Sequence, residues 1–310
     1  MRMMLGWALW FASFTAVEAR DVFVNNNGGD DRATGLLAES SPDMNGPVRT
    51  IAKALRLAQL GDRIVLAANE EPYRESISLV GERHSGLEDY PFVIEGNGAL
   101  LDGSMPVPPN AWNHVRGEIF AFQPPRLGYQ QLFLDGRPLL RKPATSLNWS
   151  VPELAPMEWA LAAGKIHFRA ATGQIPQNYS LSCAGLQTGI TLCYVHDVVI
   201  RNLIVQGFQV DGINAHDAVH DGRLIGVTAR GNGRAGVTVS GGSRFELAEC
   251  VLGDNGVVQL RAESYSQTQV FDTDLIANTG PAYVIDDARL FIDSKEVGPE
   301  EEPAQAVEKK

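Results

Sequence analysis

The sequence predicts an all-β chain that winds as a right-handed parallel β-helix solenoid, with an N-terminal strand and helix cap and a proline-rich hairpin insertion. Two observations carry this prediction: an apolar repeat in the second half of the chain and an uneven distribution of proline. The composition is that of a globular protein, because 44% of the 310 residues are hydrophobic and 20% are charged.

The apolar repeat recurs at an almost constant interval. A mostly apolar i, i+3, i+5 pattern precedes Asn232, Asn255 and Asn278, which are evenly spaced, and an equivalent unit ends at Phe208. The second half of each unit alternates between apolar and other residues, as strands do. The apolar pairs there are Ile190/Leu192, Ile213/Ala215, Val237/Val239, Leu260/Ala262 and Tyr283/Ile285. We expect these columns to stack inside the solenoid and the three asparagines to form a ladder at one turn.

A leucine-rich repeat is the competing interpretation of the same period, since its pattern also ends in asparagine. That fold needs a helix or a 3₁₀ segment in the second half of each unit. The stretch from 236 to 240 reads Gly-Val-Thr-Val-Ser, which alternates and is β-branched. The second half therefore favours parallel strands.

The elements follow in chain order. Residues 20–104 read as the cap and the first coils, with a strand at 21–25, a helix from Thr50 that stops near Gly61, and a strand at 62–66. Residues 105–180 read as the hairpin and loop insertion, because eleven of the seventeen prolines lie between 91 and 176. Residues 181–293 read as coils, since 177–280 hold no proline and a ladder excludes it. Residues 294–310 read as a disordered acidic tail.

The N-terminus reads as a signal peptide over residues 1–19. Arg2 precedes an uncharged apolar run, and Val17 and Ala19 are small residues before a cleavage point at Arg20. We therefore expect a secreted, periplasmic or extracellular protein without a transmembrane anchor in the mature chain, and a monomer. Three cysteines, Cys183, Cys193 and Cys250, cannot form a closed disulfide framework, and whether Cys183 and Cys193 pair stays open.

The cap resembles a known family. Residues 23–31, 46–55 and 61–66, Tyr73-Arg-Glu75, and the segments 91–96 and 101–104 look like the N-terminal signature of secreted pectate-lyase-like β-helix proteins. The resemblance covers residues 21–104, and the coil pattern extends it over 181–293. It implies the fold, and it implies polysaccharide lyases, hydrolases, epimerases or domains without activity as the range of functions.

The net charge of −11 argues against nucleic acid as a partner. A polysaccharide or glycan is the expected partner, held on the outward face of the second-half strands. One predicted outward column is Thr191, Asn214, Thr238, Arg261 and Val284, and the next is Cys193, His216, Ser240, Glu263 and Asp286. We take Arg261, Glu263, Asp286 and His216 as catalytic candidates. The candidates for binding substrate are Asn214, Arg261, Trp112, Trp149 and Trp159.

Two further groups have residue types that suit metal or acid–base chemistry. His196-Asp197 and His220-Asp221 are one repeat apart and should stack, although aspartate before a strand is also a common turn residue. The loop from Asn25 to Asp31 offers oxygen atoms for Ca²⁺. Its spacing is not that of an EF-hand, so no metal site is assigned and Ca²⁺ is the only cofactor considered.

Two functions remain open from the sequence. The chain is either a polysaccharide lyase or glycoside hydrolase, or a non-catalytic β-helix module that binds glycans or builds a surface assembly. The resemblance implies a lysine or arginine base for a lyase, and residues 166–294 contain no lysine. Glu263 and Asp286 are the one stacked carboxylate pair that suits a hydrolase.

Overall fold

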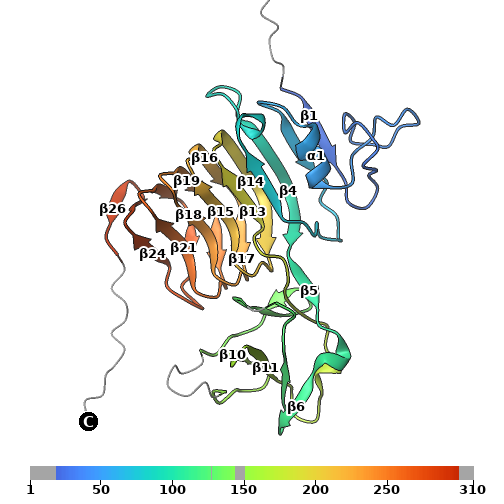
Figure 1. Ribbon diagram of the computed structural model, residues 1–310, viewed down its shortest axis with the longest axis vertical. Coiled ribbons are helices and arrows are strands. Elements are labelled where there is room, and N and C mark those ends of the chain that lie inside the picture. Colours follow the sequence, from blue (N-terminus) through green and yellow to red (C-terminus); the bar gives the residue numbers. More distant parts are fainter. Residues whose placement is uncertain (1–18, 127, 144–150, 300–310) are drawn as a thin grey trace, which may run out of the picture.

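The computed structural model describes residues 19–126, 128–143 and 151–299. Strands hold 46% of the structure and helices 6%, so the predicted all-β class is confirmed. The strands form two large sheets whose internal pairings are parallel, apart from the last strand of the first sheet, and two small antiparallel sheets in a separate lobe (Figure 1). The predicted signal peptide lies outside the described residues except for Ala19.

The first sheet contains 12 strands. Its main path runs through β1 (Asp21–Val24), β2 (Arg63–Leu66), β4 (Phe92–Asp102), β14 (His196–Gln206), β16 (His220–Ile225), β19 (Arg244–Ala248), β22 (Gln267–Phe271), β25 (Arg289–Ile292) and β26 (Lys295–Val297). A branch of this sheet holds β17 (Thr228–Arg230), β20 (Val251–Gly253) and β23 (Asp274–Leu275). The second sheet holds β3 (Ile77–Val80), β13 (Ile190–Cys193), β15 (Asp211–Asp217), β18 (Ala235–Val239), β21 (Val258–Glu263) and β24 (Tyr283–Asp286).

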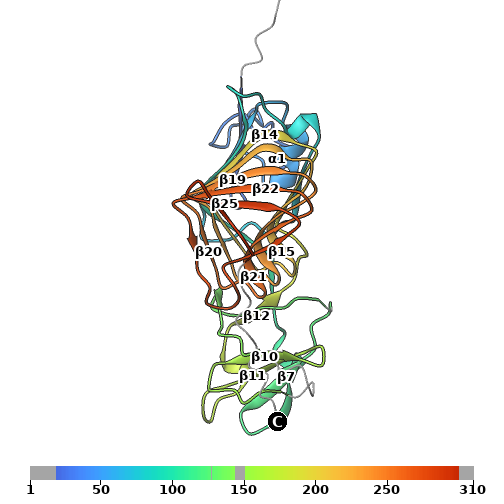
Figure 2. The ribbon, with the colours of Figure 1, turned by 90° about the vertical axis from the view of Figure 1, so that its left-hand side faces the viewer.

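The chain visits the two sheets alternately, one repeat unit at a time, so that successive units stack (Figure 2). In the first sheet Leu224 is paired with Leu247, which is paired with Val270. In the second sheet Ile213, Val237 and Leu260 stack in the same way. Because every one of these side chains is at most 1% exposed, they form the core between the sheets, whereas Tyr283 and Ile285 of the last predicted pair are only partly buried. Burial of each contributes roughly 1.5–3 kcal/mol.

The strands in the second half of each unit exclude the leucine-rich-repeat alternative, which needs a helix or 3₁₀ segment there. β15, β18, β21 and β24 are extended and are paired in parallel register. The alternating β-branched residues that predicted these strands therefore fold as expected.

The asparagine ladder is shorter than predicted. Asn255 Oδ1 accepts hydrogen bonds from the backbone N–H and the Nδ2 of Asn232, and its own Nδ2 donates to Gln259 Oε1. Asn232 and Asn255 are fully buried, whereas Asn278 is exposed and bonds Asp254. The ladder is thus continued by Gln259, because the turn at Asn278 lies in the last unit and has no following coil to cover it.

The cap contains one helix, α1 (Ile51–Leu57), whose first residue follows the predicted N-cap Thr50. Thr50 Oγ1 accepts from the Lys53 N–H, and the Glu75 carboxylate accepts from the N–H groups of Ile51 and Ala52. The helix ends at Leu57, earlier than the predicted stop at Gly61, because Ala58 adopts an extended conformation. A 3₁₀ turn, η1 (Glu82–His84), follows β3.

The proline-rich insertion is a lobe of two antiparallel four-stranded sheets. One holds β6 (Asn113–Arg116), β7 (Ile119–Phe122), β10 (Trp159–Ala162) and β11 (Lys165–Arg169). The other holds β5 (Ser104–Pro106), β8 (Leu132–Leu134), β9 (Arg137–Pro138) and β12 (Leu181–Ala184). Short 3₁₀ turns, η2 (Pro109–Ala111) and η3 (Pro176–Asn178), connect them. Since β5 and β12 are paired with each other, the lobe spans 104–184 rather than the expected 105–180.

The lobe is attached to the turns that follow β17 and β20. Gln131 Nε2 donates to the carbonyl oxygens of Asn232 and Asp254, and Gln206 Nε2 donates to that of Gly136. These contacts place one end of the lobe beside the two large sheets, as Figure 1 shows.

The C-terminal segment is ordered further than predicted. β26 is paired with β25 in antiparallel direction, and Arg289 on β25 forms an ion pair with Glu296 on β26. The expected disordered tail from 294 therefore begins with a strand, and residues 300–310 lie outside the described residues. No helix in the described ranges is long and apolar enough to cross a membrane.

Candidate functional site

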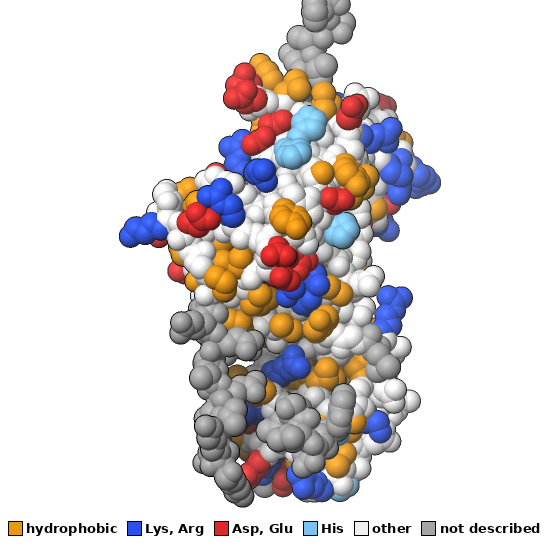
Figure 3. Space-filling view, turned by 60° about the vertical axis from the view of Figure 1, so that its left-hand side comes forward, with side chains coloured by type: hydrophobic (Ala, Val, Ile, Leu, Met, Phe, Trp, Pro, Cys, Tyr) orange, Lys and Arg blue, Asp and Glu red, His pale blue; other side chains and the backbone are white. Residues whose placement is uncertain are grey.

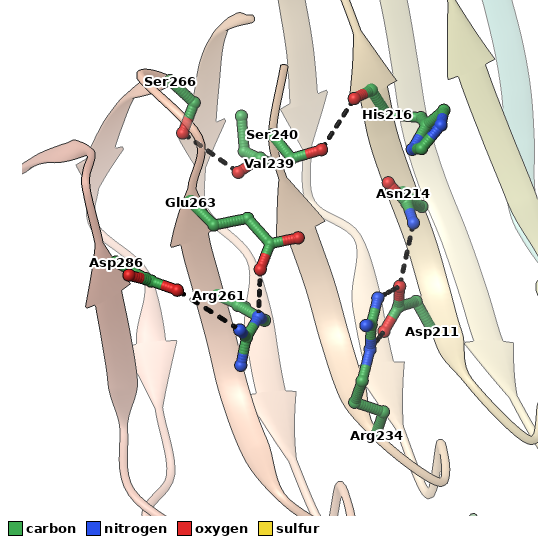
Figure 4. Close-up of polar contacts among 10 residues, drawn as sticks. All are labelled: Asp211, Asn214, His216, Arg234, Val239, Ser240, Arg261, Glu263, Ser266 and Asp286. Atoms are coloured by element: carbon green, nitrogen blue, oxygen red, sulfur yellow. Dashed lines mark hydrogen bonds and ion pairs between the residues drawn. The ribbon is translucent and has the colours of Figure 1, made fainter. Parts of the chain in front are cut away.

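The predicted outward column on the second sheet exists in the expected register. Thr191, Asn214, Thr238, Arg261 and Val284 occupy successive rungs of β13, β15, β18, β21 and β24. Glu263 and Asp286 are likewise paired on β21 and β24. We call Asp211, Asn214, Arg234, Arg261, Glu263 and Asp286, which cluster on this face, the shelf (Figure 4).

Arg261 joins two carboxylates from adjacent strands. Its Nε donates to Oε2 of Glu263 at 2.5 Å, and its Nη2 lies 3.9 Å from Oδ2 of Asp286. The Asp286 side chain is 68% exposed, whereas those of Arg261 and Glu263 are 26% and 21% exposed. Three of the four predicted catalytic candidates therefore meet at an accessible surface.

A second ion pair on the shelf, Asp211 with Arg234, was not predicted from the sequence. Arg234 Nε and Nη2 donate to the two oxygens of Asp211, and Asn214 Nδ2 also donates to Asp211. Asp211 is fully buried, and its hydrogen bond raises the pKa of Arg234 above its ordinary value. The repeat interval could have predicted this pair, because residues 211 and 234 are one repeat apart and therefore lie in neighbouring units.

Two polar atoms beside these ion pairs have no partner within the described part of the chain. They are Oδ1 of Asn214 and Oγ1 of Thr238, and both are buried. An unpaired buried polar atom costs about 1–3 kcal/mol of stability. The centre of the shelf therefore has hydrogen-bonding capacity that the protein itself does not use.

His216 lies apart from the other three catalytic candidates. It is an exposed residue on β15, and β18 separates it from Glu263 on β21. Figure 4 shows its ring beside Asn214, and its carbonyl oxygen accepts from Ser240 Oγ. His216 is therefore not in contact with Arg261, because β18 lies between their strands, and its catalytic role stays a prediction.

The predicted column that contains His216 is irregular at its start, at Cys193. Cys193 is paired with Asp217 rather than His216, because the register between β13 and β15 shifts after Leu192. Cys183, Cys193 and Cys250 are all free thiols. Burial raises the pKa of Cys183 to about 12, so its thiol stays protonated at neutral pH and is a poor nucleophile.

Two exposed tyrosines lie where the chain leaves strands of the second sheet. Tyr265 follows β21 and is 81% exposed, and Tyr194 follows β13 and is 61% exposed. Both have φ in the left-handed region, at 62° and 55°, where a bulky side chain is strained. Tyr265 is also close to the carboxylate pair in the fold, because its backbone N–H donates to the Asp287 carbonyl oxygen.

The tryptophans predicted to bind substrate are in a core. Trp159 is 0% exposed and Trp112 is 8% exposed, and both pack inside the insertion lobe with Phe122 and Phe168. They cannot stack on a sugar in this structure, so this prediction was wrong for both. Trp149 lies outside the described residues.

Some side chains of the groups considered for metal binding have protein partners. His196 and His220 do stack as predicted, and His196 Nδ1 lies 3.0 Å from Asp197 Oδ2. In the Asn25–Asp31 loop, the Asp31 carboxylate accepts from the N–H groups of Arg49 and Thr50, so it holds the start of α1. Within the described ranges, no three His, Cys, Asp or Glu side chains are grouped so that they could hold a metal ion.

Acidic and basic side chains are interspersed over the face that Figure 3 shows, without a patch of one sign. A surface of this kind suits ligands with many hydroxyl groups, because carboxylates accept hydrogen bonds and guanidinium groups donate them.

No protein-family model matches the chain, and no curated protein sequence matches it. Its fold is similar to that of a solved structure described as "Glycoside hydrolase", with 11% identity and a TM-score of 0.58 over 87% of this chain and 74% of the other. Weaker matches are a complex of XylC with xylose (11% identity, TM-score 0.41, 90% and 73% covered) and pectate lyase Pel9A (10%, 0.36, 83% and 54%). At these identities the comparison with the glycoside hydrolase shows the fold alone.

Proposed function

We propose that this chain is an exported right-handed parallel β-helix protein that binds polysaccharide across the shelf. The observation that carries the proposal is the contact of Arg261 with both Glu263 and Asp286 at an accessible surface. The glycoside hydrolase with a similar fold supports it as an analogy at the level of architecture.

The shelf offers a sugar three kinds of contact. Arg261 can hold a carboxylate or a pair of hydroxyls through a charge-assisted contact. Asn214 and Thr238 contribute buried oxygen atoms without protein partners among the described residues. Tyr265 supplies an exposed aromatic face at the border of the carboxylate pair.

The carboxylate pair is also the candidate for hydrolysis. Neighbouring strands lie about 4.8 Å apart, close to the ~5–5.5 Å between carboxyl groups in retaining glycosidases. One carboxyl group must carry a proton to act as general acid, whereas here both carboxylates face the Arg261 guanidinium. A bound sugar that draws Arg261 away would release one carboxylate, and Asp286 is the more exposed of the two.

The non-catalytic alternative is supported by the same ion pairs. A guanidinium that satisfies both carboxylates is a stable arrangement for a binding surface and an unfavourable one for acid catalysis. Turnover separates the two functions, since a binding module would retain sugar affinity without releasing new reducing ends or unsaturated products.

The test is to incubate residues 20–310 with neutral and acidic polysaccharides and to measure binding, reducing ends and unsaturated-product absorbance. The double variant Arg261→Ala with Glu263→Gln should weaken glycan binding at least tenfold and leave the unfolding temperature within a few degrees. Arg289→Ala is the matched control, because Arg289 is also paired with a glutamate but lies on the first sheet. Binding that survives the double variant would overturn the proposal.

A further inference from the structure

A polar groove of about 800 Å³ lies on the outer face of the first sheet, away from the strands that carry the shelf. Its floor and walls come from β16, β19 and β22, and the side chains that matter most are Asp221, Arg223, Arg244, Glu246, Gln267 and Gln269. Asp197 on β14 and Glu88 of the cap close one end.

Strand register arranges these side chains in two rows. Arg223, Glu246 and Gln269 occupy successive rungs of the first row. Arg244 and Gln267 are paired in the second row, two positions earlier on the same strands. Each row therefore presents hydrogen-bond donors and acceptors side by side at the rung spacing of about 4.8 Å.

Most of these side chains have no partner in the protein. Over residues 19–126, 128–143 and 151–299, the side chains of Asp221, Arg223, Glu246, Gln267 and Gln269 make no hydrogen bond or ion pair to another protein group, and Arg244 bonds only the carbonyl oxygen of Gly242. The shelf differs in this respect, because Arg234 and Arg261 are both paired there. The polar groups of the groove are thus free for a ligand without first breaking an ion pair.

We infer that this groove binds a short, uncharged oligosaccharide. A hydroxyl group both donates and accepts, so a sugar can satisfy a row in which guanidinium and amide donors alternate with carboxylate acceptors. The groove holds the carboxylates of Glu88, Asp197, Asp221 and Glu246 against two guanidinium groups, so an acidic sugar or a phosphate is disfavoured. Three steps between four strands span roughly 14 Å at ~4.8 Å each, which is the length of a short oligosaccharide.

This site uses none of the shelf residues, and its ligand class follows from its own charges. Failure of the proposed polysaccharide site on the second sheet would therefore leave this inference unaffected, and the reverse also holds.

Calorimetric titration with cellotriose, xylotriose and maltotriose, and with trigalacturonate as the acidic probe, tests the inference. We expect at least one neutral trisaccharide to bind, and the variant Arg223→Gln with Glu246→Gln to weaken that binding tenfold or more. Arg32→Ala in the cap is the control, because Arg32 is exposed, pairs with Asp30 and does not line the groove, and it should leave this affinity unchanged.

Three results would overturn the inference. They are the absence of binding by all three neutral sugars, an affinity that the double variant leaves intact, and binding of trigalacturonate that depends on Arg223. Thermal unfolding of each variant identifies a loss of sugar affinity that comes from misfolding. If the double variant misfolds, the single variant Gln269→Ala tests in its place whether the first row binds the sugar.

Discussion

Arg234, the residue directly before β18, donates two hydrogen bonds to the carboxylate of Asp211, the first residue of the neighbouring strand β15. Asp211 is fully buried, and the Arg234 side chain is 23% exposed. This pair is therefore built into the sheet, in contrast to the contact of Arg261 with Asp286, whose side chain is mostly exposed.

The first prediction concerns this difference. Arg234→Ala would leave the Asp211 charge buried without a partner, and removal of one member of a buried pair costs about 3–5 kcal/mol. Arg261→Ala should cost about 1 kcal/mol or less, because Asp286 is mostly exposed and Glu263 is partly exposed, so neither charge is left fully buried. Urea unfolding measures the loss in the free energy of unfolding for each variant. Equal losses would show that Arg261 is also a structural residue.

The second prediction concerns the polar ladder. Asn255→Ala orphans the backbone N–H of Asn232 and leaves its Nδ2 only the bond to the Val205 carbonyl oxygen, and an orphaned buried donor costs about 1–3 kcal/mol. Asn278→Ala, at an exposed position, should stay within about 0.5 kcal/mol of the wild type. Thermal unfolding compares them, and similar losses would contradict the ladder described above.

The third prediction concerns the core columns. Leu252 is 0% exposed and stacks between Ala229 and Leu275. Leu252→Asp places an unpaired charge among apolar side chains, so the domain should fail to fold. Val257→Asp is the control, because Val257 is 39% exposed. Circular dichroism distinguishes the outcomes, and a folded Leu252→Asp variant would mean that the column does not face the interior.

The fourth prediction concerns acid sensitivity. Burial raises the pKa of Glu95, but hydrogen bonds from Asn202, from the Asn97 backbone and from Arg201 outweigh it and lower the pKa below its ordinary value. Because the folded state holds this proton less tightly than the unfolded state, the stabilisation is present above the unfolded pKa of about 4.3. It is lost as the pH falls through the folded value.

Glu95→Gln should therefore destabilise the protein by about 1–3 kcal/mol at pH 7 and flatten the fall in unfolding temperature below about pH 4.3. Glu39→Gln in the exposed cap loop serves as the control. An unchanged acid transition in Glu95→Gln would show that other carboxylates determine it.

The sequence predicted the parts of this fold that depend on local spacing. A constant repeat interval places Leu224, Leu247 and Val270 on one line, and alternation puts Arg261 and Glu263 on the same outward face. The stacking of His196 on His220 was predictable for the same reason. Buried Trp112 and Trp159 were not, because aromatic residues in a loop-rich insertion give no period from which to tell an inner from an outer face.

By itself, then, the sequence determined that the chain is made of stacked parallel strands and which residues share a rung, since a strand repeat sets register and face. Only the tertiary structure decided which outward residues have partners and which are free. It paired Arg234 with buried Asp211, moved Cys193 opposite Asp217 through a register shift, and left Arg223 and Glu246 without partners among the described residues, above a groove. The physical reason is that side-chain direction, local twist and irregular register determine contact across rungs, and none of these is contained in the spacing of the residues.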